Sequence, residues 1–170
     1  MATSLPSWLL RDCTAFVDGA NKIGQIGDVT IPVPAVKVEE LRNGGMVRPR
    51  EIHLGYEKMD MSLKLPGMDP QVWKLFGLKP GTEKQILVTG ALVSEDGSTV
   101  NASLTVRGFF KSANGGNWKP GQTGENDHGF AVNYYKLEIA GEEILAVDDF
   151  DVVVGGESQM SDIRQALLLT

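Results

Sequence analysis

Strict alternation of apolar and polar side chains over residues 99–110 is the feature that most constrains how this chain can fold. One side of the segment carries the apolar residues Val100, Ala102, Leu104 and Val106. The other side carries the polar residues Thr99, Asn101, Ser103, Thr105 and Arg107. A period of two is that of a β-strand with one buried and one solvated face. Residues 58–65 repeat it, with Met59, Met61, Leu63 and Leu65 alternating with Lys58, Asp60, Ser62 and Lys64.

Further strands are predicted over residues 86–93 and 130–139 because both are rich in β-branched and aromatic side chains. Ala140 and Gly141 are typical of a tight hairpin turn into another strand over 143–147. One helix is well marked, since Asp69 is a good N-cap, Pro70 suits the first helical position and Gly77 suits the end. A short C-terminal helix is expected over 161–168.

These elements predict a mainly β fold class: an antiparallel β-barrel or sandwich with one packed α-helix over about residues 69–77. A long extended loop over about 40–51 and the short C-terminal helix complete it. The 170 residues suit a single domain, 1–170, with an N-terminal segment and a C-terminal segment, 148–170.

The charge distribution disfavours one class of function, tight binding of nucleic acid. The chain has 16 basic and 22 acidic residues, a formal net charge of −6. Seven acids and no base lie between residues 141 and 162, namely Glu142, Glu143, Asp148, Asp149, Asp151, Glu157 and Asp162. A protein that grips nucleic-acid phosphates needs a basic face, so this class is disfavoured.

No catalytic, metal or cofactor site is predicted. His53 and His128 lie in no recognisable motif, and the lone Cys13 is interpreted as a small core residue. The acidic patch of Asp148, Asp149 and Asp151 offers oxygen ligands but lacks an EF-hand pattern. The N-terminus has no signal-peptide features and no segment is long and apolar enough to cross a bilayer, so we expect cytoplasmic synthesis and no membrane partner.

Two stretches do not suit a compact barrel. Residues 30–50 begin as an edge-like strand with Pro32 and Pro34 and continue into a basic loop. Residues 111–129 form a long glycine-rich loop around a single tryptophan, Trp118. Loops of this length in a small domain usually bind something or become ordered on assembly.

The order of several short motifs resembles the major tail tube proteins of contractile-tailed bacteriophages and R-type pyocins. One motif is the Glu-x-x-Arg-x-Gly-Gly-Met stretch over residues 39–46. Other motifs in matching order lie at residues 16–19, 24–32, 54–55, 76–78, 107–108, 118–121, 134–138 and 141–144, and the specificity lies in their order and spacing together. The resemblance covers almost the whole chain.

The resemblance implies a structural subunit that forms hexameric rings, stacked into a hollow tube inside a contractile sheath. It implies as partners other copies of the chain, the sheath, tape measure, baseplate and tail terminator proteins, and DNA only as transiting cargo. It places the protein in the virion tail after assembly in the host cytoplasm. It also assigns the loop at 40–51 to contact with an adjacent ring, through Arg42, Asn43, Gly44, Gly45, Met46, Val47 and Arg48.

The polar strand faces have two interpretations, a solvated outer surface or the wall of a lumen shared by several subunits. The candidate lumen face comprises Lys58, Asp60, Ser62, Lys64, Asn101, Ser103 and Thr105. The acidic C-terminal stretch either faces that lumen and repels DNA or faces outward towards the sheath.

Two other functions stay open at this stage. A tube subunit of a type VI secretion system has the same architecture. A carbohydrate-binding β-sandwich would instead use Trp118 with Tyr134 or Tyr135 as a stacking platform.

Overall fold

The structure is a computed structural model that describes residues 8–169. The first residues of the predicted N-terminal segment therefore lie outside the described residues, as does Thr170. The elements are β1 (Leu9–Val17), β2 (Ala20–Asn21), β3 (Val29–Thr30), β4 (Val36–Leu41), β5 (Arg50–Tyr56), β6 (Met59–Leu65), α1 (Pro70–Trp73), β7 (Lys84–Val93), β8 (Thr99–Asn114), β9 (Asn126–Ile139), β10 (Glu142–Val147), β11 (Val152–Val154), β12 (Glu157–Ser158) and α2 (Ser161–Ala166).

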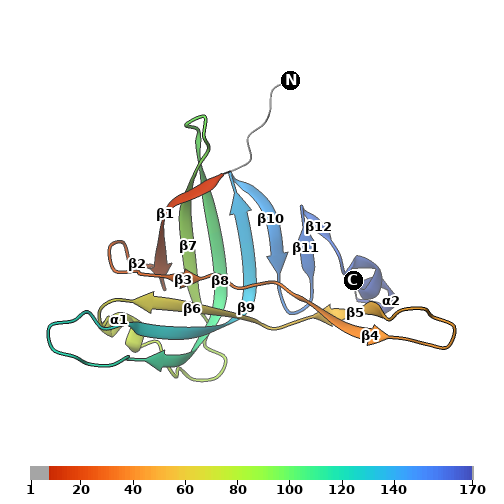
Figure 1. The fold of residues 1–170 in the computed structure, drawn as a ribbon, viewed down its shortest axis with the longest axis horizontal. Coiled ribbons are helices and arrows are strands. Elements are labelled where there is room, and N and C mark those ends of the chain that lie inside the picture. Colours follow the sequence, from red (N-terminus) through yellow and green to blue (C-terminus); the bar gives the residue numbers. More distant parts are fainter. Residues whose placement is uncertain (1–7, 170) are drawn as a thin grey trace.

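Two crossing layers share the long strands β8 and β9 (Figure 1). The upright layer has the strand order β12-β11-β10-β9-β8-β7-β1-β2. The crossing layer is formed where the first half of β9 leaves β10 and pairs with β6, which in turn pairs with β3. Strands that pass from one layer to the other are typical of orthogonal packing. The fold is thus sandwich-like rather than a closed barrel.

The bend in β8 and β9 has a local cause at Gly108. Arg107 pairs with Tyr134 but Gly108 pairs with Val132, so β9 carries one extra residue at the corner, a β-bulge. A β-carbon on Gly108 would lie 1.8 Å from the carbonyl oxygen of Ala131. Only glycine allows the two backbones to approach this closely.

The core lies between the two layers. It is built from the inward faces predicted by the alternation, including Leu104 and Val106 of β8 and the apolar side of β6. The central side chains are Phe130, Leu63 and Ile86, all fully buried. Phe110 packs edge-on against Phe130 at a ring distance of 4.9 Å. Burial of such side chains contributes about 1.5–3 kcal/mol each.

Helix α1 begins as predicted, because the Asp69 side chain accepts the backbone N–H of Gln71. The regular helix ends at Trp73, and turns continue to Gly77, which has a φ of 69°. Helix α1 is therefore shorter than the helix predicted over residues 69–77. Lys22 secures its N-terminus, with Nζ 2.5 Å from Asp69 and 2.8 Å from Gln71 Oε1.

The segment predicted as a long loop over 40–51 is the end of a β-hairpin. Strands β4 and β5 pair from Val36–Tyr56 to Leu41–Arg50, and only residues 42–49 form the tip. The hairpin projects from the body at one end of the long axis (Figure 1, orange). The predicted glycine-rich loop is also shorter, since β8 and β9 extend to leave residues 115–125. The turn at Ala140 and Gly141 has positive φ at both residues, as predicted.

Candidate assembly surfaces

The outer face of the upright layer carries one half of the predicted lumen set. Asn101, Ser103 and Thr105 lie on the side of β8 opposite the buried Leu104 and Val106. The strand register places Ser103 opposite Glu138 and Thr105 opposite Lys136, so these side chains share one surface.

The charges on this surface neutralise one another. Lys136 Nζ lies 3.0 Å from Glu138 and 3.5 Å from Glu143. Bonding to Glu138 raises the pKa of Lys136, with a smaller contribution from Glu143. The Arg107 guanidinium stacks over the Tyr134 ring at 4.1 Å. These four residues, Arg107, Lys136, Glu138 and Glu143, are two bases and two acids with no net charge.

The other half of the predicted lumen set lies on the crossing layer. Lys58 directly precedes β6, and Asp60, Ser62 and Lys64 lie on the side of that strand opposite its buried methionines and leucines. Asp60 is 2.5 Å from Lys111 of β8, and bonding to Lys111 lowers the pKa of Asp60. Asp127 of β9 lies directly opposite Lys64 on the same face, so this surface carries at least two aspartates beside its three lysines. The structure therefore separates the seven predicted lumen residues onto two surfaces, one on each layer.

The predicted contact loop forms the hairpin tip. All six residues of β4 are exposed, and Val47 at the tip is 95% exposed. Met46 donates its N–H to the carbonyl of Asn43, and Gly45 has a φ of 85°. The tip is thus an ordered turn that presents an apolar side chain between Arg42 and Arg48.

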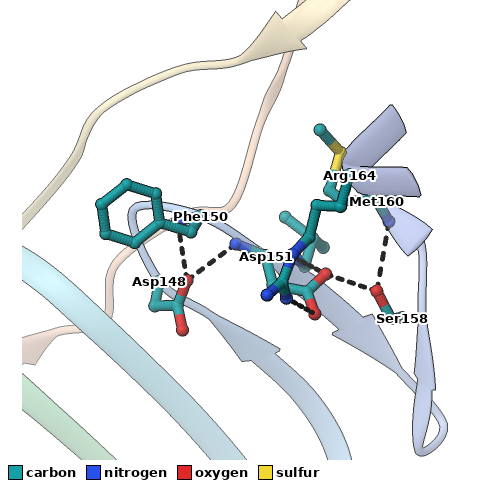
Figure 2. A network of polar contacts seen from close by, with 7 residues as sticks. Asp148, Phe150, Asp151, Ser158, Met160 and Arg164 are labelled. Atoms are coloured by element: carbon teal, nitrogen blue, oxygen red, sulfur yellow. Dashed lines mark hydrogen bonds and ion pairs between the residues drawn. The ribbon is translucent and has the colours of Figure 1, made fainter. Parts of the chain in front are cut away.

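Two of the three acids in the predicted C-terminal patch have roles within the fold (Figure 2). Asp148 Oδ1 accepts the N–H groups of Phe150 and Asp151, both at 2.7 Å. Asp151 accepts the Ser158 hydroxyl at 2.6 Å and lies 3.6 Å from Arg164 of α2. These contacts connect the β10–β11 turn to β12 and α2. Asp149 is exposed on the same turn.

His128 is buried beneath α1. Its ring packs edge-on against Trp73 at 5.4 Å and Phe110 at 6.2 Å, and it is only 1% exposed. Desolvation lowers the pKa of His128, although Asp127 and Asp69 act in the opposite direction. His53 lies on the exposed hairpin, beside Tyr56. The two histidines therefore belong to different parts of the molecule and form no common site.

The structure also tests the predicted roles of Cys13 and of the aromatic side chains proposed to stack against a carbohydrate. Cys13 is exposed, so its interpretation as a core residue is wrong. Tyr135 is buried and cannot be a stacking platform, whereas Trp118 is 79% exposed on the 115–125 loop. Within residues 8–169, no group of three or more His, Cys, Asp or Glu side chains could hold a metal ion. Neither described helix is long and apolar enough to span a membrane.

Comparison with known proteins assigns the family. The profile of the family described as "Phage tail tube protein FII" matches residues 8–167. The chain belongs to this phage tail tube family. The family consists of structural proteins, which confirms the prediction that the chain is not an enzyme.

Two curated relatives carry consistent names. The tail tube protein of Escherichia phage P2 is 25% identical over 162 residues, covering 92% of this chain and 94% of the relative. The major tail tube protein of Serratia phage KSP20 is 28% identical over 141 residues, covering 82% and 81%.

Solved structures share the fold. A chain from the sheath/tube terminator of an extracellular contractile injection system in its extended state has a TM-score of 0.59 at 12% identity. The match covers 81% of this chain and 99% of that chain. A chain from the sheath–tube complex of that system has a TM-score of 0.57 at 13% identity, covering 81% and 94%. At this identity the likeness concerns the fold.

Sequence reasoning missed part of the upright surface. Lys136, Glu138 and Glu143 join Ser103 and Thr105 there, because cross-strand register places them side by side. Alternation within β9 indicates which of its residues share a face. It does not reveal which strand lies next to it, so the cluster could not be assembled from the sequence.

Proposed function

We propose that this tail tube family member is the repeating subunit of a hollow tube made of stacked hexameric rings. The tube would lie inside a contractile sheath in the virion tail and conduct DNA during ejection. Its partners would be other copies of the chain, the sheath, the tape measure protein, and the baseplate and terminator proteins. Assembly would take place in the host cytoplasm.

The observation that carries this proposal is the polar outer face of the upright layer, on which both bases are paired or stacked. A conduit for DNA must not hold phosphate groups, because cationic walls would slow transit. The two bases on this face, Arg107 and Lys136, are engaged by Tyr134, Glu138 and Glu143. We therefore assign Asn101, Ser103 and Thr105 to the lumen and the β6 surface, with its three lysines, to the outside.

Unpaired edges of the same layer support ring closure. Among the described residues, β1 pairs with β7 along its length, but its other edge pairs with β2 only at Phe16 and Val17. At the far side, β10 pairs with β11 only over residues 145–147. Open edges of this kind accept a strand from another chain. Head-to-tail contacts that close by rotation produce a ring.

Electron microscopy of the purified protein at high concentration tests the proposal. We expect rings or tubes with a central pore, whereas a dispersed 18.4 kDa monomer would contradict it. Deletion of residues 43–48, which we propose contact the adjacent ring, should leave folded monomers or single rings. Long tubes of the deletion variant would refute the role of that tip.

Labelling tests the lumen assignment separately. Ser103→Cys and Ser62→Cys, each on a Cys13→Ser background, are coupled to a maleimide–gold particle and then assembled. Gold at Ser103 should lie within the pore and gold at Ser62 outside it. The reverse arrangement would exchange the two surfaces.

A further inference from the structure

An apolar groove lies between the root of the β4–β5 hairpin and the C-terminal strands. Val36, His53 and Tyr56 form its hairpin side, and Leu145 and Val152 belong to its opposite side. The groove has a volume of about 460 Å³. This is large enough to hold side chains of another segment.

Two carboxylates lie at the groove. Glu57 lines it, and Glu157 pairs directly with the groove-lining Val154, so the two share a face. Within residues 8–169, neither Glu57 nor Glu157 belongs to an ion pair.

The hairpin tip has the complementary character. Arg42, Arg48 and Arg50 carry three positive charges, and residues 42–50 contain no acid. In the described part of the chain these arginines make no ion pair either. Val47 is 95% exposed between them and is an apolar side chain suited to the groove.

A single copy cannot bring the two surfaces together. The hairpin strands are extended from Val36 to Leu41, so the six residues of β4 hold the tip roughly 20 Å from the root. A tip that fills the groove must therefore come from another molecule.

We propose that residues 42–48 of one copy dock into this groove of a second copy. Val47 is the apolar anchor, and Arg42 and Arg48 face Glu57 and Glu157 of the receiving chain. The docking rests on the proposed function, because it specifies the receiving surface for the tip when subunits assemble. Opposite charges on the two surfaces give the contact its orientation as well as its attraction.

Disulfide cross-linking tests the docking in assembled protein. The variant Val47→Cys/Gln159→Cys, on a Cys13→Ser background, places one thiol on the tip and one on the groove wall. Oxidation of assembled tubes should give a ladder of covalent oligomers on denaturing gels. The single variants Val47→Cys and Gln159→Cys should give none, and neither should Val47→Cys/Gln122→Cys, whose second thiol lies on the 115–125 loop.

The outcomes separate the two proposals. Tubes that form without the Val47–Gln159 cross-link overturn the docking and leave the tube function intact. Protein that forms neither rings nor tubes overturns both.

Charge exchange provides an independent test. Arg48→Glu and Glu57→Lys should each raise the protein concentration needed for assembly by about tenfold or more, because each opposes like charges. The double variant Arg48→Glu/Glu57→Lys should recover assembly. Lys37→Glu, on the same hairpin but on the strand face opposite Val36 and Val38, should have little effect. Absence of recovery in the folded double variant would contradict the pairing.

Discussion

The two-layer body and the β4–β5 hairpin are built from similar β-strands but are stabilised in different ways. In the body, β6 alternates between buried and solvated residues, and its apolar face joins one continuous core. In the hairpin, every residue of β4 is exposed, and Val38, Leu41 and Ile52 are among its exposed apolar side chains. A two-stranded hairpin is at best marginally stable alone. The body is therefore specified by its own contacts, whereas we propose that the hairpin acquires its partners in assembly.

The largest expected effect on the free energy of unfolding comes from a substitution at Gly108, where β8 and β9 bend between the two layers. Gly108→Ala would place a methyl group against the carbonyl of Ala131, which the paired strands cannot move away. We expect a loss of more than about 4 kcal/mol, which is a large part of the stability of a typical domain. Denaturant unfolding, circular dichroism and soluble yield measure it. The matched control is Gly44→Ala at the hairpin tip, where nothing lies within 4 Å of the added carbon; a Gly108→Ala protein as stable as this control would contradict the argument.

A smaller loss in the free energy of unfolding is expected when the ion pair that connects the body to α1 is removed. Lys22→Met should cost about 3 kcal/mol, because it leaves the partly buried Asp69 carboxylate without its cation. Burial alone would raise the pKa of Asp69, but Lys22 and the Gln71 N–H lower it overall. Denaturant unfolding of dilute monomer measures the change. Lys84→Met, which removes a more exposed pair with Asp18, should cost less than about 1 kcal/mol; equal losses would refute the distinction.

Acid sensitivity should come from the body and not from the hairpin. The pKa of His128 is lowered in the folded protein, so the unfolded chain binds more protons below its ordinary value of 6.5. The free energy of unfolding should therefore fall as the pH drops below about 6.5, by at most about 1.4 kcal/mol per pH unit. The loss stops when the pH reaches the lowered pKa.

The measurement for this prediction is denaturant unfolding between pH 7 and pH 5, above the range in which carboxylates titrate. His128→Gln should flatten the profile. His53→Gln on the hairpin should retain the acid-dependent loss. A profile that is unchanged by His128→Gln would show that another group is responsible.

The smallest effect on stability is expected at the hairpin tip. Val47→Ser should change the free energy of unfolding of the monomer by less than about 0.5 kcal/mol, because the side chain is almost fully exposed. The same substitution should prevent tube growth in electron micrographs. A large loss of monomer stability, or normal tubes, would contradict the contrast between hairpin and body.

The sequence predicted local features of the body well. Alternation identified the strands that contain Leu104 and Leu63, and the Asp69–Pro70 pair located the start of α1. These features depend on residues close together in the chain, and each leaves a local pattern.

The arrangement of the site could not be predicted in the same way. The bend at Gly108 places Ser103 and Ser62 on different layers, although both lie on regularly alternating strands. The sequence predicts an edge-like strand from residue 30 and a loop over 40–51 instead of a hairpin, because β4 has a Glu-Glu step and β5 carries a register shift near Gly55, which obscure the alternation. Asp148 and Asp151 looked like surface charge, and only the tertiary structure shows them bonded to the turn, β12 and α2.

The passage of β8 and β9 through both layers has a mechanical consequence. The two strands are joined by twelve residue pairs, from Ala102–Ile139 to Asn114–Asp127, on both sides of the corner. A load that pulls the layers apart along these strands must shear many hydrogen bonds at once instead of opening them one after another. We therefore expect the two layers to resist separation most strongly at this corner, because the covalent chain crosses it in both strands.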